Sequence, residues 1–185
     1  MATYDGGKTY LTTSLASKPD IMVNYMFATT FNIPESSMLT FKSEIEDLLV
    51  KARTNIIPGR NTAEIESNFM GSQQYFPGKT TYPHKVTITF EEFQDGGTHS
   101  VFKKWQDAIY NPLTGVRISN YKKNYSADIV CTLMGTDGSI IGEPIVFQTA
   151  WVSDVGEPSL SYDDSGKVVF EVTFTYDKWC YASEV

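Results

Sequence analysis

Histidines and paired carboxylates are the side chains in this sequence that could hold a metal or transfer a proton. His84 and His99 are the two histidines, and neither has another histidine or a cysteine at the spacing of a zinc site. Glu91 and Glu92 are neighbours in a strand-like segment, so their carboxylates point to opposite faces and do not converge on one substrate bond. The sequence has no P-loop, nucleophile-elbow, HExxH or dinucleotide-binding motif. These observations favour a protein that is not an enzyme, and they predict neither a metal site nor a cofactor.

Charge, hydropathy and cysteine usage limit the partners and the compartment. The 15 basic and 22 acidic residues give a net charge of −7, which opposes an electrostatic grip on nucleic acid, and the adjacent Lys122 and Lys123 are expected to be solvated. No segment has the length and apolarity of a transmembrane helix, and residues 1–8 lack the order of a signal peptide, so we expect no membrane binding. Cys131 and Cys180 lie far apart without CxxC spacing. We therefore expect two buried free thiols in a chain that is made in the cytoplasm.

Composition predicts a mainly β fold in one domain over residues 1–185. Thr, Val, Ile, Tyr and Phe supply 68 residues, whereas Ala and Leu supply 17, and branched and aromatic side chains suit a pleated sheet better than a helix. A chain of this length buries a continuous core without disulfides or metal.

Alternation of apolar and polar residues places the strands, and glycine and proline place the turns. The first expected strands are residues 21–31, 63–69 and 85–93, with a turn at Pro77–Gly78. The C-terminal third is predicted to form two hairpins, residues 127–134 with 139–152 and residues 159–162 with 167–179. Gly135–Gly138 and Asp163–Gly166 are their expected turns.

One segment reads clearly as a helix. Thr98 or Ser100 is the expected N-cap, and Asn111–Pro112 ends the pattern. The core-facing residues at helical spacing include Val101, Phe102, Trp105 and Ile109.

Residues 38–53 are ambiguous from periodicity alone. Ile45, Leu48 and Ala52 fall on one stripe of a helix, but alternation from Leu48 onward also fits a strand.

Two blocks of the sequence resemble the tail tube proteins of contractile-tailed bacteriophages. Residues 76–109, FPGKTTYPHKVTITFEEFQDGGTHSVFKKWQDAI, are similar to that family's strand, loop and helix block. Residues 146–179, ending in VVFEVTFTYDKW, are similar to its closing strands, and weaker likeness covers residues 47–79 and 126–134. Because the matching region of the family is a strand, the resemblance predicts a strand over residues 47–54. The arm of residues 1–20 and the insertions or loops at 32–46 and 113–125 have no clear counterpart, so the resemblance assigns them no contacts.

The resemblance implies a β-sandwich or partly open barrel with one flanking helix, assembling into hexameric rings that stack into a tube. Each subunit would contribute four strands to a continuous inner barrel. About 24 strands spaced about 4.8 Å apart and tilted about 40° give a backbone diameter of roughly 45–50 Å. Such a barrel leaves a bore of about 40 Å, which is wide enough for a DNA duplex.

An acidic lumen suits DNA in transit, because a negative wall repels phosphates and each basic contact would slow passage. By alternation we assign Glu64, Glu66, Asp128 and Gln148 to the lumen, with Lys51 and Arg53 as basic partners between strands. The alternative to a lumen is that these residues only form a solvent-exposed face of a sheet. The candidate ring-stacking loop between two inner strands comprises Asn55, Ile56, Ile57, Pro58, Gly59, Arg60 and Asn61.

The resemblance implies a virion tail component that is assembled in the host cytoplasm and carries the genome during ejection without specific DNA binding. Its implied partners are further copies of itself, the sheath, baseplate and tail-terminator proteins outside, and the tape measure protein inside. One alternative is the tube of a contractile injection or type VI secretion system, which passes protein instead of DNA. Capsid and terminase genes in the genome neighbourhood of this gene would favour the phage. From other classes, a carbohydrate-binding sandwich could use Tyr75, Phe76 or Tyr82, and a hydrolase would need a pocket of convergent polar groups.

Overall fold

The computed structural model describes residues 24–185 apart from residues 36, 95–96, 118 and 163–165. The expected N-terminal arm (residues 1–20), the start of the first expected strand and the Asp163–Asp164 turn therefore lie outside the described residues. The strands are β1 (Phe27–Asn32), β2 (Asn61–Phe69), β3 (Ser72–Thr81), β4 (Lys85–Glu91), β5 (Tyr110–Asn111), β6 (Val116–Arg117), β7 (Ala127–Leu133), β8 (Ile145–Val155), β9 (Val169–Thr175) and β10 (Lys178–Tyr181). The helices are α2 (Lys42–Glu46), α3 (Leu48–Lys51) and α4 (Gly97–Ile109), with 3₁₀ turns η1 (Lys122–Asn124) and η2 (Ala182–Glu184).

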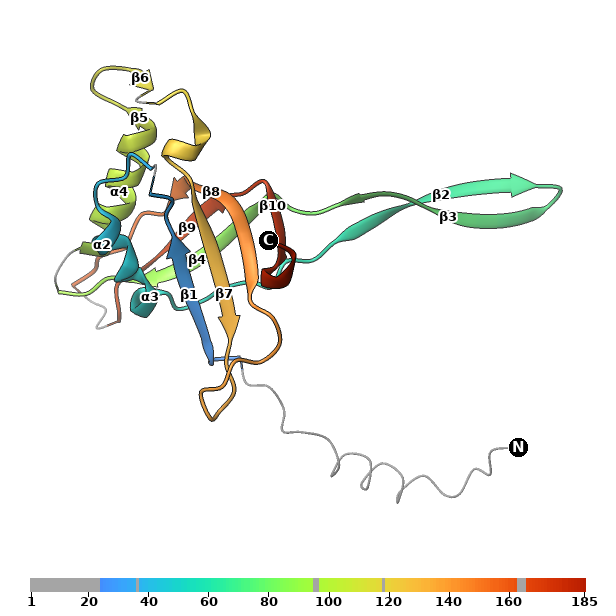
Figure 1. The fold of residues 1–185 in the computed structure, drawn as a ribbon, viewed down its shortest axis with the longest axis horizontal. Coiled ribbons are helices and arrows are strands. Elements are labelled where there is room, and N and C mark those ends of the chain that lie inside the picture. The colour runs from blue at the N-terminus through green and yellow to red at the C-terminus, as the bar shows by residue number, and fades with distance from the viewer. Residues whose placement is uncertain (1–23, 36, 95–96, 118, 163–165) are drawn as a thin grey trace.

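The body of the molecule is an antiparallel sheet in the order β1-β7-β8-β9-β4, with β10 also paired to β8 (Figure 1). Strand β8 belongs to both halves of this sheet, because its first residues pair with β7 and β10 and its last residues pair with β9. The described sheet does not close into a barrel. Instead, residues 52–55 span its two edge strands: the Arg53 amide donates to the Thr89 carbonyl at 2.7 Å, and the Asn55 amide group donates to Thr29 Oγ1 at 2.9 Å. The fold is therefore mainly β, as composition predicts.

The bend in β8 is at Thr149, whose backbone φ is +52°. An L-residue rarely adopts this conformation, so neighbouring groups must hold it. Asp128 Oδ1 accepts the Thr149 N–H at 2.8 Å, and Thr149 Oγ1 donates to Asp177 Oδ2 at 2.6 Å. Lys122 Nζ donates to the other oxygen of Asp177. The Lys122 and Thr149 hydrogen bonds lower the pKa of Asp177 below its ordinary value.

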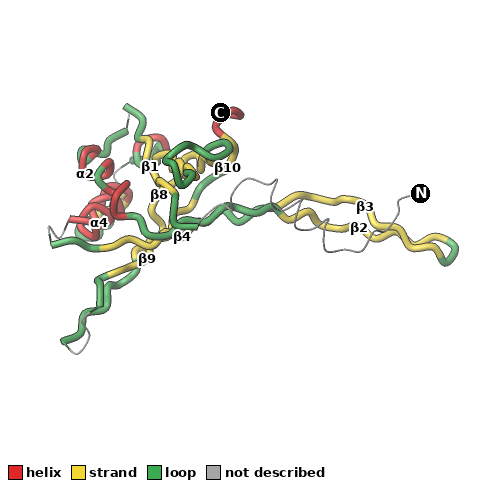
Figure 2. The backbone as a smooth tube through the Cα atoms, turned by 90° about the horizontal axis from the view of Figure 1, so that it is seen from below, coloured by secondary structure: helices red, strands yellow, loops and turns green. Residues whose placement is uncertain are grey.

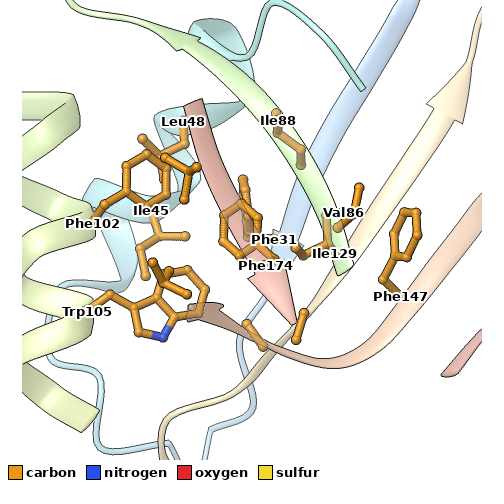
Figure 3. Packing of buried hydrophobic residues seen from close by; sticks show 14 of the residues in the cluster. Phe31, Ile45, Leu48, Val86, Ile88, Phe102, Trp105, Ile129, Phe147 and Phe174 are labelled. Atoms are coloured by element: carbon orange, nitrogen blue, oxygen red, sulfur yellow. The ribbon is translucent and has the colours of Figure 1, made fainter. Parts of the chain in front are cut away.

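Helix α4 packs against the sheet and contributes one of its faces to the core (Figure 3). Val101, Phe102 and Trp105 are buried, and Ile109 packs half-buried against the same cluster. The Trp105 ring meets Phe174 edge-on at 6.0 Å between centroids, and its indole N–H donates to the Tyr125 carbonyl at 2.7 Å. The aromatic stripe of this helix is thus core packing with its polar atom satisfied.

The N-terminus of α4 is capped by a residue outside the helix. Glu92 Oε1 accepts the Thr98 N–H at 3.0 Å, and Glu92 Oε2 accepts the His99 N–H at 2.8 Å. The predicted caps Thr98 and Ser100 are wrong, because both residues already lie inside the helix. A carboxylate suits this position, since it satisfies two orphan amides and faces the positive end of the helix dipole.

The strand predicted over residues 47–54 is also wrong. The segment begins with the short helix α3, and Ala52 alone makes an isolated bridge to Phe90. Ile45 and Leu48 are both fully buried, and residues three apart share one face of a helical turn. The helical alternative wins because it brings both side chains into the core at once. It also places Lys51 on α3, where its ammonium lies 5.7 Å from the centre of the Phe93 ring.

The second predicted C-terminal hairpin does not form as expected. Residues 159–162 have no strand, and β9 pairs instead with β8 on one side and β4 on the other. Pairing with two long strands satisfies both edges of β9, which a four-residue partner could not do. The hairpin of β7 with β8 does form, and Cys131 and Cys180 are free, buried thiols as expected.

Candidate assembly surface

Strands β2 and β3 form a hairpin arm that projects away from the body (Figures 1 and 2). Apart from Gly78, every residue of the two strands is exposed. Nine strand residues at about 3.3 Å each give the arm a length of roughly 30 Å. A lone two-stranded hairpin is marginal in water, so this arm is a part of the fold that lacks its packing partner within the described chain.

The arm continues through the predicted turn at Pro77–Gly78, which is therefore wrong. Both residues lie inside β3, and the register shifts beside them between Thr62 and Glu64. Proline is tolerated because the strand is at an edge, and the irregularity is a β-bulge. A Cβ on Gly78 would come within 3.0 Å of the Ala63 carbonyl oxygen. The close strand approach thus explains why this position is glycine.

The strand register divides the arm into an apolar and a polar face. Ile65 pairs with Phe76, and their side chains are 56% and 49% exposed. Glu64 and Glu66 lie on the opposite face, where Glu66 pairs with Tyr75. The arm therefore presents an uncharged face, on which Ile65, Phe76 and Phe69 form an apolar strip beside Ser67 and Gln74 that nothing in the described chain covers, and behind it a face that carries Glu64 and Glu66 together with Tyr75.

The tip of the arm is a two-residue turn formed by Met70 and Gly71, with φ of +48° and +80°. This turn favours asparagine, aspartate or glycine at both positions. Met70 nevertheless occupies the first position and is 93% exposed, and the adjacent Phe69 is 73% exposed. The tip thus carries two large apolar side chains at a local conformational cost.

The base of the arm is fixed to the body at both strands. The Arg60 guanidinium stacks over the Trp179 ring, 4.4 Å from its centre, and Tyr82 Oη donates to the Asp177 carbonyl at 3.3 Å. A guanidinium on an indole face is among the stronger cation–π pairs. These two contacts connect the residue before β2 and the residue after β3 to the body.

A shallow apolar groove of about 480 Å³ lies at the end of the sheet near this base. It is lined by Ile57, Leu133, Ile141, Gly142, Glu143, Ile145 and Tyr181. Ile57, Ile141 and Tyr181 are exposed there. The lining carboxylate of Glu143 accepts a hydrogen bond from Ser183 Oγ at 2.6 Å.

The six predicted lumen residues lie in three separate places: on the arm, beside the bend of β8, and at helix α3 with the segment after it. Glu64 and Glu66 are on the acidic face of the arm. Asp128 and Gln148 lie beside the bend of β8, where Asp128 bonds the Thr149 amide and Gln148 Nε2 donates to Cys180 Sγ at 3.4 Å.

The two predicted basic partners lie on helix α3 and in the segment that follows it. Lys51 lies on helix α3, and Arg53 forms an ion pair with Glu91 of β4. Burial by itself raises the pKa of the Glu91 carboxyl. The hydrogen bonds and positive charges of Arg53 and Lys167 outweigh this effect and lower the pKa below its ordinary value. Within one copy the six residues therefore do not share a face.

The predicted ring-stacking segment, residues 55–61, connects α3 to the arm and runs into β2. The prediction that it joins two inner strands is wrong, because the element before it is helical. It does supply Arg60 of the arm base and Ile57 of the groove.

The sequence patterns above do not predict the uncovered apolar face of the arm, its tip or the Arg60–Trp179 stack. The alternation through Ala63, Ile65 and Ser67 signalled the apolar face, but the paired strand was hidden by the proline and glycine of β3. Tyr75 and Phe76 point to opposite faces of the arm and Tyr82 lies at its base. The three aromatics therefore do not gather into one platform for a sugar.

Among the described residues, no group of three or more histidines, cysteines or carboxylates is placed to hold a metal ion. No helix in the same part of the chain is long and apolar enough to cross a membrane.

Three solved structures share this fold at low sequence identity. A chain of the PVC extracellular contractile injection system, in the sheath–tube complex in its extended state, is 16% identical with a TM-score of 0.56 over 92% of this chain and 96% of that one. A chain of the PVC sheath/tube terminator is 15% identical with a TM-score of 0.59 over 89% and 98%. A chain of the anti-feeding prophage baseplate is 10% identical with a TM-score of 0.58 over 89% and 96%. No curated protein matches the sequence.

The antiparallel sheet, the packed helix and the hairpin arm make up a fold that this chain shares with those three chains. The model of the family described as phage tail tube protein matches residues 20–182. The chain belongs to that family, as the resemblance of its two sequence blocks predicts.

Proposed function

We propose that copies of this tail tube protein join into hexameric rings, which stack into the tube through which a phage genome leaves the tail. The exposed, two-faced hairpin arm is the observation that carries the proposal. Its apolar face has no cover within the described chain, although fully burying a large apolar side chain contributes about 1.5–3 kcal/mol. We assign that cover to a neighbouring copy of the same chain.

The acidic face of the arm supports a role as a conduit. If the apolar strip packs against a neighbour, Glu64 and Glu66 are left on the other side, facing the lumen. Their charges repel DNA phosphates and oppose sticking during transit. Asp128 and Gln148 belong to this lumen only if the bend of β8 faces inward, whereas Lys51 and Arg53 are assigned to the body of the subunit.

The proposed partners follow from the tube. Sheath, baseplate and terminator proteins would contact it outside and at its ends, and a tape measure protein would lie inside. The tube would then be part of the virion and would be assembled in the host cytoplasm.

A second candidate is the tube of a contractile injection system that carries protein. The fold shared with chains of two such particles over about nine-tenths of this chain favours it. A genome neighbourhood with capsid and terminase genes would favour the phage.

Negative-stain electron microscopy with sedimentation velocity tests the assembly. Purified protein should form rings or rods with an axial hole. The variant I65D/F76D should remain folded and monomeric, because it places two carboxylates on the strip that a neighbour must cover. L113D is the matched control, since Leu113 is exposed on the distant loop between β5 and β6 and its variant should still assemble. A wild-type chain that stays monomeric at every concentration would refute the proposal.

A further inference from the structure

The groove beside the base of the arm and the tip at the far end of the arm are complementary in chemistry. Apart from the hydrogen-bonded Glu143, the groove is lined by uncharged residues, mostly apolar. Residues 69–74 of the tip, FMGSQQ, carry no charge. Contact between the two surfaces would therefore bury apolar side chains without adding an unpaired charge.

The groove is large enough for the side chains that the tip presents. A cavity of about 150 Å³ holds a benzene ring, so a groove of about 480 Å³ admits the phenyl ring of Phe69 together with the side chain of Met70.

The tip of one chain does not reach the groove of the same chain. Ile57 of the groove lies at the root of the arm, whereas Met70 lies at its outer end, roughly 30 Å away along extended strands (Figures 1 and 2). Any copy of this tip that occupies this groove must come from a second molecule.

The backbone at the tip supplies an independent reason to look for a partner. Methionine at φ +48° is a poor choice for turn formation, where asparagine or glycine would cost less. A residue that disfavours its own backbone conformation, as Met70 does here, often marks a functional site. Here the side chain gained in exchange is large, flexible and apolar, which suits contact with a shallow groove.

We infer that Phe69 and Met70 at the tip of the arm insert into the groove lined by Ile57, Ile141 and Tyr181 on the next copy of this chain. The inference rests on the proposed assembly function and names the contact within it. The tip and the groove are different surfaces, so the contact is head-to-tail, and each added copy presents a new tip and a new groove.

Disulfide trapping between two variant chains tests this contact. The M70C chain is mixed with the I141C chain under mild oxidation, and F69C with I57C provides a second pair. A disulfide needs Cα atoms within about 7 Å, and the native Cys131 and Cys180 are buried. The control is M70C mixed with L113C, in which the second cysteine lies at a position that is more exposed than Ile57 or Ile141 and far from the groove.

A cross-linked dimer in the tip-plus-groove mixtures, absent from each variant alone and from the L113C control, supports the inference. Equal linking to L113C, or linking of M70C only to itself, overturns it, as does the absence of any cross-link. Electron microscopy of unoxidised wild-type protein separates the two failures. Rings or rods without the cross-link remove only the tip contact, whereas monomers alone remove the assembly proposal as well.

The variant M70N separates docking from folding. Asparagine is favoured in this turn, so the thermal midpoint should not fall, yet the concentration needed for assembly should rise about tenfold or more as the buried side chain is lost. An unchanged assembly threshold in M70N overturns the inference.

Discussion

Replacing Glu92 by alanine should destabilise the fold through helix α4. The Glu92 carboxylate accepts the amides of Thr98 and His99 at 3.0 and 2.8 Å, and both amides lose their partner in E92A. Loss of an N-cap costs about 0.5–2 kcal/mol, and hydrogen bonds to a charged group lie at or above the upper end of that range. Because Glu92 is half-buried and water replaces part of the loss, we expect a decrease of about 2 kcal/mol in the free energy of unfolding.

The assay is urea unfolding followed by circular dichroism, at a concentration where the chain is monomeric. The midpoint should fall without a change in slope, and the thermal midpoint should drop by about 4–8 °C for a chain of this size. E92Q keeps one oxygen acceptor and should lose about half as much. E46A is the matched control, since Glu46 is exposed at the end of α2.

The reasoning about the cap fails if E92A stays within about 0.5 kcal/mol of the wild type. It fails equally if E46A loses as much stability as E92A, because the effect would then come from removing any acidic side chain.

Three further predictions concern the arm and the bend. E64K/E66K should leave tubes intact on micrographs but delay DNA delivery in an ejection assay, and unchanged kinetics would contradict the lumen assignment. Replacing Arg60 by alanine should leave the thermal midpoint nearly unchanged but raise the assembly threshold in sedimentation, because loss of the stack on Trp179 frees the arm to swing; an unchanged threshold would count against this. The lowered pKa of Asp177 means that its carboxylate stabilises the fold above pH 3.8 and that this contribution is lost on further acidification. D177N should therefore be less stable than wild type at pH 7, with a gap that narrows below pH 3.8 in acid unfolding curves.

Sequence reasoning succeeded where one periodic pattern extended over a full element. The helix through Phe102 and Trp105 and the strand through Val86 and Ile88 bury the residues that their spacing places on one face. These elements pack directly against the core, so local pattern and tertiary structure demand the same conformation.

Prediction failed where the deciding contacts are distant in sequence. Helical and strand patterns fit residues 47–54 equally well, and only packing of Leu48 beneath the sheet selects the helix. Pro77–Gly78 has the local signature of a turn, yet the pairing of β3 with β2 overrides it. The bend at Thr149 likewise depends on Asp128 and Asp177, which lie 21 and 28 residues away. The Glu92 cap is closer in sequence, but it lies six and seven residues before the amides it accepts, outside the usual N-cap position.

The arm also bears on how single copies survive before they meet a growing end. Nothing in the described part of the chain covers the apolar face of the arm, so every encounter between free copies risks premature association. Seven surplus negative charges on each molecule give mutual repulsion at long range. Salt shortens that range, so the ionic strength of the surroundings sets how readily dispersed subunits become filament.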